Sequence, residues 1–447
     1  MNGNDTVARF VRDITWEALP TAVQRVARMA LLDALGATLA GTLTPVSRIT
    51  AEYAAETWPG DEATILLHGR RASAIGAAFA NGYAANGVDI DDCALYTRGH
   101  PGAQIFPTAL ALGEALAAGG SKMLAAMVAG YEVAHRTARI WHATHDVYQA
   151  CGSWGSVACA AIAAHLLGLS PEQTRHALGI ADYHAPNLPM MRDIDDPAMV
   201  KHGIGWGAMT GITAAQLAAR GFTGVPSVLG LNEYSDWVGD IGRTYIAAGG
   251  VAWKGYACCA WNHAAMKGAG QLVAAHSIDV GEIAHVYVEA PHETVRLGTE
   301  LPATTEEAQF SLAWPLAALL VDGEVGPAQV LDHRFSDVQI RSLAEKIELV
   351  EAKDLNDLSR LLQKGDPRGK YAARVTITLR DGTLLESGMV EGNINYPQQG
   401  WDEERLEEKF RWLAGHVLDG GRVGELVEMV RHFELVGDVR QLTQLLI

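Results

Sequence analysis

The chain has 447 residues, of which 49% are apolar and 19% charged, an ordinary balance for a globular protein. A chain of this length exceeds what one hydrophobic core supports, so two domains are expected. The formal net charge of −17 argues against nucleic-acid binding, which needs a basic face, and against an anionic membrane surface. A small anionic substrate stays compatible, because the field inside a pocket depends on the cations that line it.

The cysteines and the N-terminus predict a cytoplasmic protein with reduced thiols. The five cysteines are odd in number, and Cys258 and Cys259 are adjacent, which is awkward for a mutual disulfide. The segment Met1–Asp5 lacks the basic region and apolar core of a signal peptide. An apolar run such as 156–169 contains a histidine and is too short to span a membrane.

From Thr6 to about Gly268 the sequence is rich in Ala and Gly, with apolar residues at helical spacing. In the last helix of this region Asp196 can act as the cap and Pro197 can open the helix. The spacing predicts helices at 23–32, 108–118, 122–139, 154–169, 171–181 and 197–220.

Gly203, Gly207 and Gly211 recur every fourth residue and leave a stripe without side chains. Glycine weakens a helix by about 1 kcal/mol per site, so the stripe predicts close approach of a neighbouring helix. Helices packed on small residues all round are typical of a buried bundle.

The pattern changes after about Lys267. Segments that alternate between apolar and polar residues predict strands, and Asp381 with Gly382 forms a hairpin turn between two of them. The chain is helical again from Trp401 onward. Strands are expected at 285–290, 374–379 and 383–386, and helices lie between them around 308–320 and 337–347.

The fold class expected from these patterns is mainly α with a second α+β domain. Residues 1–267 and 400–447 would form a large, discontinuous, all-helical bundle domain. Residues 268–399 would form a small α+β domain inserted before the last helices.

The segment from Asp89 to Gly102 is the first candidate site. It gathers three carboxylates, a phenol, a guanidinium and the imidazole of His100 between Ala- and Gly-rich helical sequences. Polar loops held by a rigid scaffold are a typical way to build an active site, and histidine is suited to moving protons at neutral pH. The alternative is a solvated acidic loop around a His-Pro-Gly turn.

Two further segments carry candidate residues. Lys201, followed by His202, falls early in the helix that opens at Pro197, where the helix dipole disfavours a cation. Binding a carboxylate would explain Lys201 there, and an ordinary surface lysine is the alternative. Lys254 and His263 lie just before the change of pattern, and a cleft between domains is a common place for a site. This second segment is a poor metal site, because adjacent cysteines chelate poorly.

The two aspartate clusters, 89–92 and 193–196, allow a different hypothesis. In a helical protein they could hold Mg²⁺ against a diphosphate. The second cluster also resembles an ordinary helix start. A magnesium enzyme would lose activity with a chelator.

Taken together, these segments resemble the MmgE/PrpD family nearly from end to end. The order and spacing of the matching segments carry the resemblance: 31–33, the loop 89–101, 152–156, Lys201, Lys254 with His263, 308–311, Asp322-Gly323 and the hairpin at Asp381-Gly382. The resemblance implies a large helical domain with a small inserted α+β domain, a homodimer, a cleft between the domains, and no metal or organic cofactor.

The resemblance places the pocket at Asp89, Cys93, His100, Lys201 and Lys254. It also implies a second histidine just before 152–155, where this chain has Gln149, and a tyrosine where it has Trp314. Glutamine does not exchange protons at neutral pH, so that acid/base group is missing or replaced. Five further residues are candidates to replace this acid/base group or to contact the substrate next to the pocket residues: Tyr148, His145, Arg98, Arg192 and His263.

Members of this family make or protonate a carbanion next to a carboxylate. Lys201 and Lys254 would bind carboxylates and stabilise enolate charge, and His100 would carry the proton. The expected function is a lyase or isomerase acting on a small di- or tricarboxylate, first a dehydratase of the 2-methylcitrate dehydratase type. The alternatives are an epimerase of an iminodisuccinate-type dicarboxylate, in which Tyr148 could be the second base, and a carboxylate-binding protein without catalysis.

Overall fold

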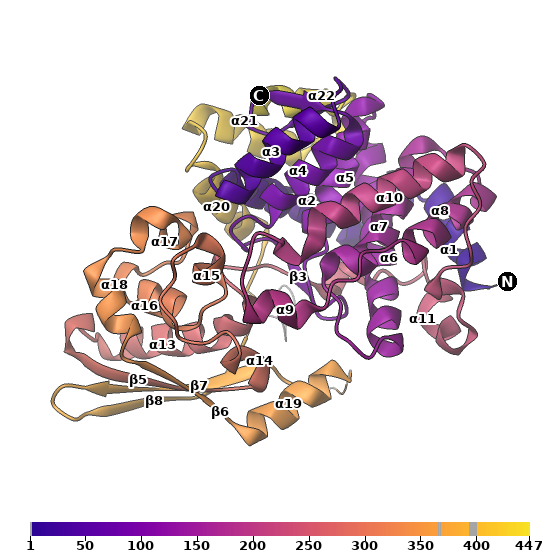
Figure 1. Cartoon of the computed structure of the whole chain (residues 1–447). Helices are drawn as coiled ribbons and strands as arrows, with labels where there is room; N and C mark the ends of the chain where they lie inside the picture. The colour runs from indigo at the N-terminus through magenta and orange to yellow at the C-terminus, as the bar shows by residue number, and fades with distance from the viewer. Residues whose placement is uncertain (1, 365, 367, 393–399) are drawn as a thin grey trace.

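The computed structural model describes residues 2–364, 366, 368–392 and 400–447, and it is mainly helical with one sheet-containing part (Figure 1). The expected mixture of a helical majority and a smaller part with strands is thereby confirmed. The helical part contains α1 (Gly3–Asp13), α2 (Thr21–Gly41), α3 (Pro45–Thr57), α4 (Ala74–Ala85), α5 (Gly102–Ala115), α6 (Gly120–Thr144), α7 (Cys151–Leu167), α8 (Pro171–Tyr183), α9 (Met190–Asp195), α10 (Ile204–Ala219), α11 (Ser235–Val238) and α12 (Ala247–Gly250).

Close packing of α7 against α10 forms the centre of the helical part. A Cβ added at Gly211 would lie 2.4 Å from Cys159 Cβ, and one at Gly207 would lie 2.8 Å from the Cα of Gly152. Neither distance is compatible with a real side chain, so the glycine stripe allows the close approach that its spacing predicts. The dense core that results holds the first residues of both helices in fixed positions.

Two predicted helix starts are wrong. Helix α5 begins at Gly102, six residues before the predicted start at 108, and Pro107 lies inside it. The helix expected from Pro197 begins at Ile204, because the three residues before it, 201–203, adopt left-handed backbone angles. A right-handed helix cannot pass through such residues.

The sheet part contains a four-stranded sheet of order β6-β5-β7-β8, in which β5 pairs with β6 in parallel and with β7 antiparallel. The alternation of β5 and β7 and the hairpin before β8 confirm the predicted strands. Helix α13 packs on β7 and β8, with α16 on its other side (Figure 1). The elements are α13 (His263–His276), β5 (Ile283–Ala290), α14 (His292–Val295), α15 (Thr305–Gln309), α16 (Ala313–Asp322), α17 (Pro327–Val330), α18 (Val338–Ala344), β6 (Ile347–Glu351), α19 (Lys353–Gln363), β7 (Ala372–Leu379) and β8 (Leu384–Glu391).

The chain returns to the helical part at its C-terminal end through α20 (Glu403–Ala414), α21 (Gly420–Arg431) and α22 (Arg440–Thr443). Helix α20 packs along α2, where Lys409 Nζ lies 2.5 Å from Asp33 Oδ1 in a buried ion pair. The predicted division between 267 and 268 falls inside α13, which packs on the sheet. The predicted end of the small domain at residue 399 lies outside the described residues.

Four short strands lie within the helical part. Strands β1 (Ala63–Ile65) and β2 (Arg70–Ala72) form a hairpin, and β3 (Cys93–Ala94) pairs antiparallel with β4 (Val251–Ala252). No single helix among the described residues is both long and apolar enough to cross a membrane; α2 and α3 pass that test only as a pair, bent by 93°.

Candidate active site

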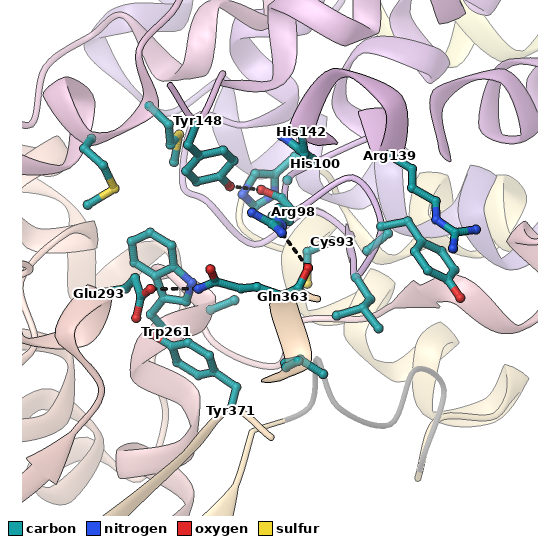
Figure 2. A pocket seen from close by; sticks show the side chains of 18 of the residues that line it. Cys93, Arg98, His100, Arg139, His142, Tyr148, Trp261, Glu293, Gln363 and Tyr371 are labelled. Atoms are coloured by element: carbon teal, nitrogen blue, oxygen red, sulfur yellow. Dashed lines mark hydrogen bonds between the residues drawn. The ribbon is translucent and has the colours of Figure 1, made fainter. Parts of the chain in front are cut away.

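A cavity of about 540 Å³ lies between the helical part and the sheet part. The helical part contributes the loop that carries Cys93, Arg98 and His100, together with residues of α6 and α9. The sheet part contributes Glu293 from α14 and Gln363 from the end of α19 (Figure 2). The cleft is thus built from segments that are distant in the sequence.

Pairing of β3 with β4 forms the floor of the site. The register places Cys93 opposite Ala252, which brings the loop that begins at Asp89 next to the segment that carries Lys254. Lys254 Nζ lies 3.0 Å from Asp89 Oδ2, and both side chains are fully buried. The loop is therefore a packed part of the interior, and the alternative of a solvated acidic loop is wrong.

His100 is held from both sides of its ring. Nδ1 donates to the carbonyl oxygen of Asp92 at 2.9 Å and lies 3.2 Å from Asp91 Oδ2. Nε2 lies 3.4 Å from Asp89 Oδ1, a distance longer than that of a strong charge-assisted hydrogen bond. The ring therefore has a fixed orientation, while Nε2 remains able to exchange its proton with a ligand in the cavity.

The pKa values of these groups follow from burial and from their neighbours' charges. Burial lowers the pKa of His100, but Asp91 and Asp89 raise it more, so the net pKa is raised and the ring favours the imidazolium form. Burial would raise the pKa of Asp89, yet Lys254 and His100 hold it well below its usual range. For Lys254, Asp89 and Asp91 outweigh burial and raise the pKa, so the amine stays charged.

A strained turn carries Lys201 and His202. Lys201, His202 and Gly203 have φ values of 42°, 56° and 65°, a region that costs non-glycine residues of order 1–3 kcal/mol each. The start of α7 packs directly on this turn, since a Cβ at Gly152 would lie 2.1 Å from the carbonyl oxygen of Gly203. On the other side Asp193 accepts from the backbone N–H of His202 at 2.9 Å.

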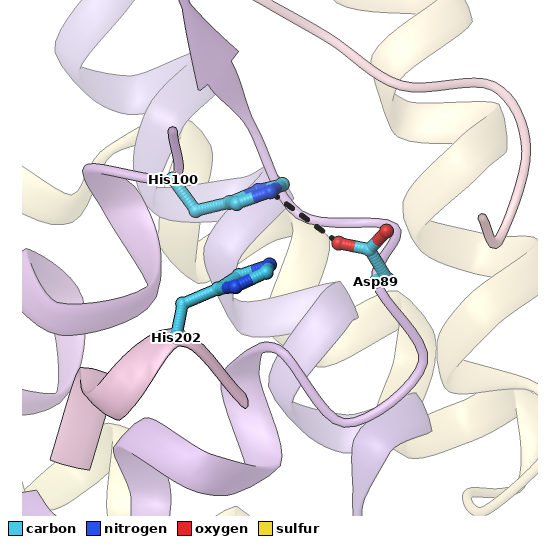
Figure 3. Close-up of side chains that lie close together, drawn as sticks. All are labelled: Asp89, His100 and His202. Carbon is cyan, nitrogen blue, oxygen red and sulfur yellow. Dashed lines mark ion pairs between the residues drawn. The ribbon is translucent and has the colours of Figure 1, made fainter. Parts of the chain in front are cut away.

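The turn brings a second imidazole to the cavity. His202 stacks on His100 with ring centroids 5.4 Å apart and an angle of 5° between the planes, and both line the cavity (Figure 3). His202 Nδ1 lies 2.8 Å from Asp193 Oδ2, and burial of that carboxyl is outweighed by His202, which lowers the pKa of Asp193. A carboxylate this close to Nδ1 favours the tautomer that carries its proton there, and in that tautomer Nε2 is the acceptor nitrogen of the ring.

Lys201 lies behind the histidines. Its amine donates to Gln309 Oε1 at 2.6 Å and sits 5.4 Å from the centre of the Phe310 ring, and its side chain is fully buried. Neither Lys201 nor Lys254 is among the residues that line the open cavity. The two lysines thus contribute positive charge from beneath the site. The electrostatic effect of this charge is stronger because the lysines are buried away from water.

Arginines face the open cavity instead. Arg98 donates to the backbone carbonyl of Gln363 at 2.7 Å, and its own carbonyl accepts from the Tyr148 hydroxyl (Figure 2). Arg139 lies over the rings of Trp237 and Tyr96, at 3.9 and 5.2 Å from their centres. Among the described residues no carboxylate pairs with Arg139, so this preorganised guanidinium is available to an anionic ligand.

Tyr148 and Cys93 line the cavity as predicted, but neither is activated. Burial raises the pKa of the Tyr148 hydroxyl and of the Cys93 thiol far above neutrality. Both groups therefore stay protonated at neutral pH, and Cys93 is not a nucleophile.

The remaining predicted residues do not line the cavity. Gln149 is buried and accepts from the Leu188 backbone N–H at 2.7 Å, and His145 stacks on Trp141. Arg192 is exposed on α9. Gln149 and His145 thus make structural contacts outside the cavity. The residue that can take the role of the missing imidazole is His202.

Two predicted substrate contacts are wrong. Trp314 is fully buried in the core of the sheet part, where its indole N–H donates to the carbonyl oxygen of Gln329 at 2.8 Å. His263 is buried at the start of α13, its Nε2 lies 3.3 Å from the Cys258 carbonyl oxygen, and burial lowers its pKa to about 3. The position of these two residues along the chain, relative to the recognisable motifs, does not show whether their side chains are buried.

Sequence reasoning missed three residues that the structure brings to the site: His202, Asp193 and Arg139. The sequence marks His202 only as the neighbour of Lys201, and inside a regular helix its side chain would point away from that of Lys201. It marks Asp193 only as a member of the second aspartate cluster. The pattern of apolar and polar residues does not mark Arg139 as a site residue, because it lies one helical turn from ordinary core residues of α6.

Asp89, His100 and His202 come nearest to a set of metal ligands, with their ligand atoms within 4.8 Å of one another (Figure 3). Lys254 already supplies a cation 3.0 Å from Asp89, and His202 is oriented by Asp193. The second aspartate cluster is also engaged, since Asp195 pairs with Arg296. The donor set therefore does not fit a divalent ion between the two clusters.

Comparison with known proteins gives matches over most of the chain. Residues 5–235 match the MmgE/PrpD N-terminal domain, and residues 256–435 match the MmgE/PrpD C-terminal domain. Human cis-aconitate decarboxylase is 29% identical over 450 residues, which cover 95% of this chain and 90% of that protein. The cis-aconitate decarboxylase-like protein oryM of Aspergillus oryzae is 25% identical over 99% of this chain and 97% of its own length, and mouse cis-aconitate decarboxylase is 25% identical over 99% and 93%.

Proposed function

Because this chain belongs to the MmgE/PrpD family, and is an enzyme of the lyase type, we propose that it dehydrates a small hydroxylated di- or tricarboxylate through a carbanion next to a carboxylate. The stacked pair of His202 and His100 carries this proposal. One imidazole is prepared to accept a proton, and the other is held in its cationic form.

In the proposed reaction His202 Nε2 takes the proton from the carbon next to a substrate carboxylate. The negative charge that develops on the enolate is stabilised by Lys254 and Lys201 behind the site. His100 then gives its Nε2 proton to the departing hydroxyl, which leaves as water while a carbon–carbon double bond forms. Asp193 stabilises the imidazolium of His202, and Asp89 stabilises that of His100.

The stacking of the two rings disfavours epimerisation. An epimerase needs acid/base groups on opposite faces of one carbon, but centroids 5.4 Å apart leave no room for a carbon between the two rings. Tyr148, the expected second base, stays protonated at neutral pH and is bound to Arg98. Two neighbouring groups on one wall suit proton removal and leaving-group protonation on the same face.

Decarboxylation is the second candidate, and the names of the relatives favour it. Loss of carbon dioxide would leave a carbanion at the carbon that carried the lost carboxylate, and His100 would protonate that carbon. That reaction needs an acid but no base, whereas this site provides both, so we place dehydration first.

Substrate carboxylates would bind to Arg98 and Arg139, which face the cavity, while the lysines act on the developing charge. We expect a homodimer in the cytoplasm. Exposed apolar side chains on α3 and around the start of α10, among them Tyr53, Met199 and Trp206, suit a contact between two subunits, and light scattering would measure the mass. All five cysteines are free and buried, as a reducing compartment allows.

The test is incubation of the purified protein with hydroxylated and unsaturated di- and tricarboxylates in D₂O, followed by proton NMR. A new vinyl signal from a hydroxylated substrate supports dehydration, and loss of carbon dioxide from an unsaturated one supports decarboxylation. Inversion of configuration with deuterium uptake and without a vinyl product would overturn the lyase proposal in favour of epimerisation. A chelator should leave the rate unchanged.

A further inference from the structure

The cavity is larger than the proposed chemistry requires. Its volume of about 540 Å³ lies in the range that drug-sized ligands occupy, whereas a simple di- or tricarboxylate has only about a dozen non-hydrogen atoms. When the reacting carbon is placed against His100 and His202, much of the space remains. What lines that remaining space decides which substituents a substrate can carry.

One side of the cavity is an apolar wall, formed by Tyr148, Met190, Met191, Trp261 and Tyr371. Trp261 and Tyr371 stack with centroids 6.4 Å apart and 20° between their planes, which gives a broad surface (Figure 2). Tyr148, Met191 and Trp261 pack against one hydrophobic cluster, whose buried members are Met190 of the wall itself together with Ala150, Ile194, Cys259, Leu297 and Phe310. The wall is therefore backed by packed side chains and cannot easily collapse into the cavity.

The two tyrosine hydroxyls on this side already have partners in the protein. The Tyr148 hydroxyl donates to the Arg98 carbonyl oxygen, and the Tyr371 hydroxyl is 3.0 Å from Thr294 Oγ1. What these rings present to the cavity is their apolar surface, and leaving it in water costs free energy that an apolar ligand would recover.

Two charged residues beside the wall are also engaged. Glu293 accepts from Gln363 at 2.8 Å, and Arg296 pairs with Asp195. Arg139, which no carboxylate of the described residues pairs with, lies across the cavity from the wall (Figure 2). The cavity thus separates an anion-binding side from an apolar side.

We infer that the natural substrate is a carboxylate that carries a bulky apolar substituent, which lies on Trp261 and Met191 while its carboxylates face the arginines and histidines. This inference rests on the proposed function, because it uses the same reacting end. It specifies the substrate class further: an unsubstituted small polycarboxylate would leave the apolar wall uncovered.

The inference is tested by titration calorimetry with two unreactive probes, succinate and 2-benzylsuccinate. They share both carboxylates and differ by one benzyl group. Burying an aromatic ring on the wall should make 2-benzylsuccinate bind roughly ten- to a hundredfold more tightly than succinate. Equal affinities, or no binding of either probe, would overturn the inference.

Variants of the wall residues test whether the wall causes the tighter binding of 2-benzylsuccinate. Trp261→Ala and, separately, Met191→Ala should remove most of the difference between the probes while leaving succinate affinity nearly unchanged, which also shows that the variant is folded. Tyr183→Ala is the matched control, since this aromatic residue is 73% exposed on α8 and does not line the cavity. A benzyl gain that survives both wall variants would contradict the placement.

The two proposals can fail separately. Tight binding of 2-benzylsuccinate without turnover of any carboxylate in D₂O would remove the lyase proposal and retain the apolar subsite. Rapid turnover of unsubstituted carboxylates, together with equal probe affinities, would retain the lyase and remove the subsite.

Discussion

The two sides of the cavity are built in different ways. On the histidine side every functional group is fixed by buried contacts: His100 by Asp91, His202 by Asp193, and the turn at Gly203 by the start of α7. On the sheet side the hydrogen bond from Gln363 to Glu293 is exposed. A rigid, buried wall suits proton transfer, where small displacements are costly, while the other side can vary with the substrate.

This difference predicts large effects on kcat for changes on the histidine side and small effects on kcat for changes on the sheet side. The same difference separates the contacts that orient catalytic groups from the contacts that only join the helical part to the sheet part.

Replacing the proposed base should have the largest effect. His202→Gln should lower kcat roughly 10²- to 10⁴-fold with little change in KM, measured on the substrate found by NMR. His142→Gln is the matched control, because His142 lines the same cavity but its Nε2 is bound to the Thr97 carbonyl oxygen at 2.9 Å. If both variants lose activity equally, His202 has no special role as a base.

The ion pair beneath the loop should matter most for stability. Lys409 bridges Asp33 on α2 and the backbone carbonyl of Ile90 at 2.8 Å, so Lys409→Met leaves a buried carboxylate unpaired and should lower the free energy of unfolding by about 3–5 kcal/mol. Arg25 and Glu403 pair at 3.2 Å between the same two helices but in the open.

Arg25→Met is therefore the control, and it should cost less than about 1 kcal/mol. Urea unfolding of both variants gives the comparison. Equal losses would mean that burial does not set the strength of these contacts.

Asp92 should make stability depend on pH. Burial, together with the charge of Asp33, raises the pKa of Asp92 to about 7, above its value of about 3.9 in an unfolded chain. Between these values the folded state holds the extra proton, so this residue's contribution to the free energy of unfolding falls as the pH rises from 4 to 7, by up to about 1.4 kcal/mol per pH unit.

Asp92→Asn removes this contribution, because an amide resembles the protonated acid. Relative to the wild type the variant should gain stability as the pH rises from 4 to 7 in urea unfolding. Asp236→Asn, at an exposed position, should follow the wild-type curve. A constant difference between Asp92→Asn and the wild type would show that Asp92 is ionised in the fold.

The smallest effect is expected on the sheet side. Gln363→Ala removes one exposed hydrogen bond to Glu293, so KM should change by less than about tenfold and kcat should be nearly unchanged. A large loss of kcat would show that this side takes part in the chemistry and would remove the contrast between the two sides.

Much of the fold follows from periodicity. Residues 285–290 alternate and form most of β5, and the Asp381-Gly382 turn joins β7 to β8, because local backbone preferences and one buried face suffice there. Helix starts follow less reliably from the sequence. Pro197 and Asp196 carry the usual start signals, but the packing of Gly152 on Gly203 imposes a left-handed turn that propensity does not predict.

The residue types at the site can be read from the sequence, and the order of the motifs groups Asp89, His100, Lys201 and Lys254 together. How these residues are used depends on the tertiary structure. Pairing of β3 with β4 neutralises Asp89 with Lys254, and the turn before α10 directs His202 onto His100. These outcomes depend on contacts between residues about 100 to 160 positions apart, and such contacts leave no periodic signal along the chain.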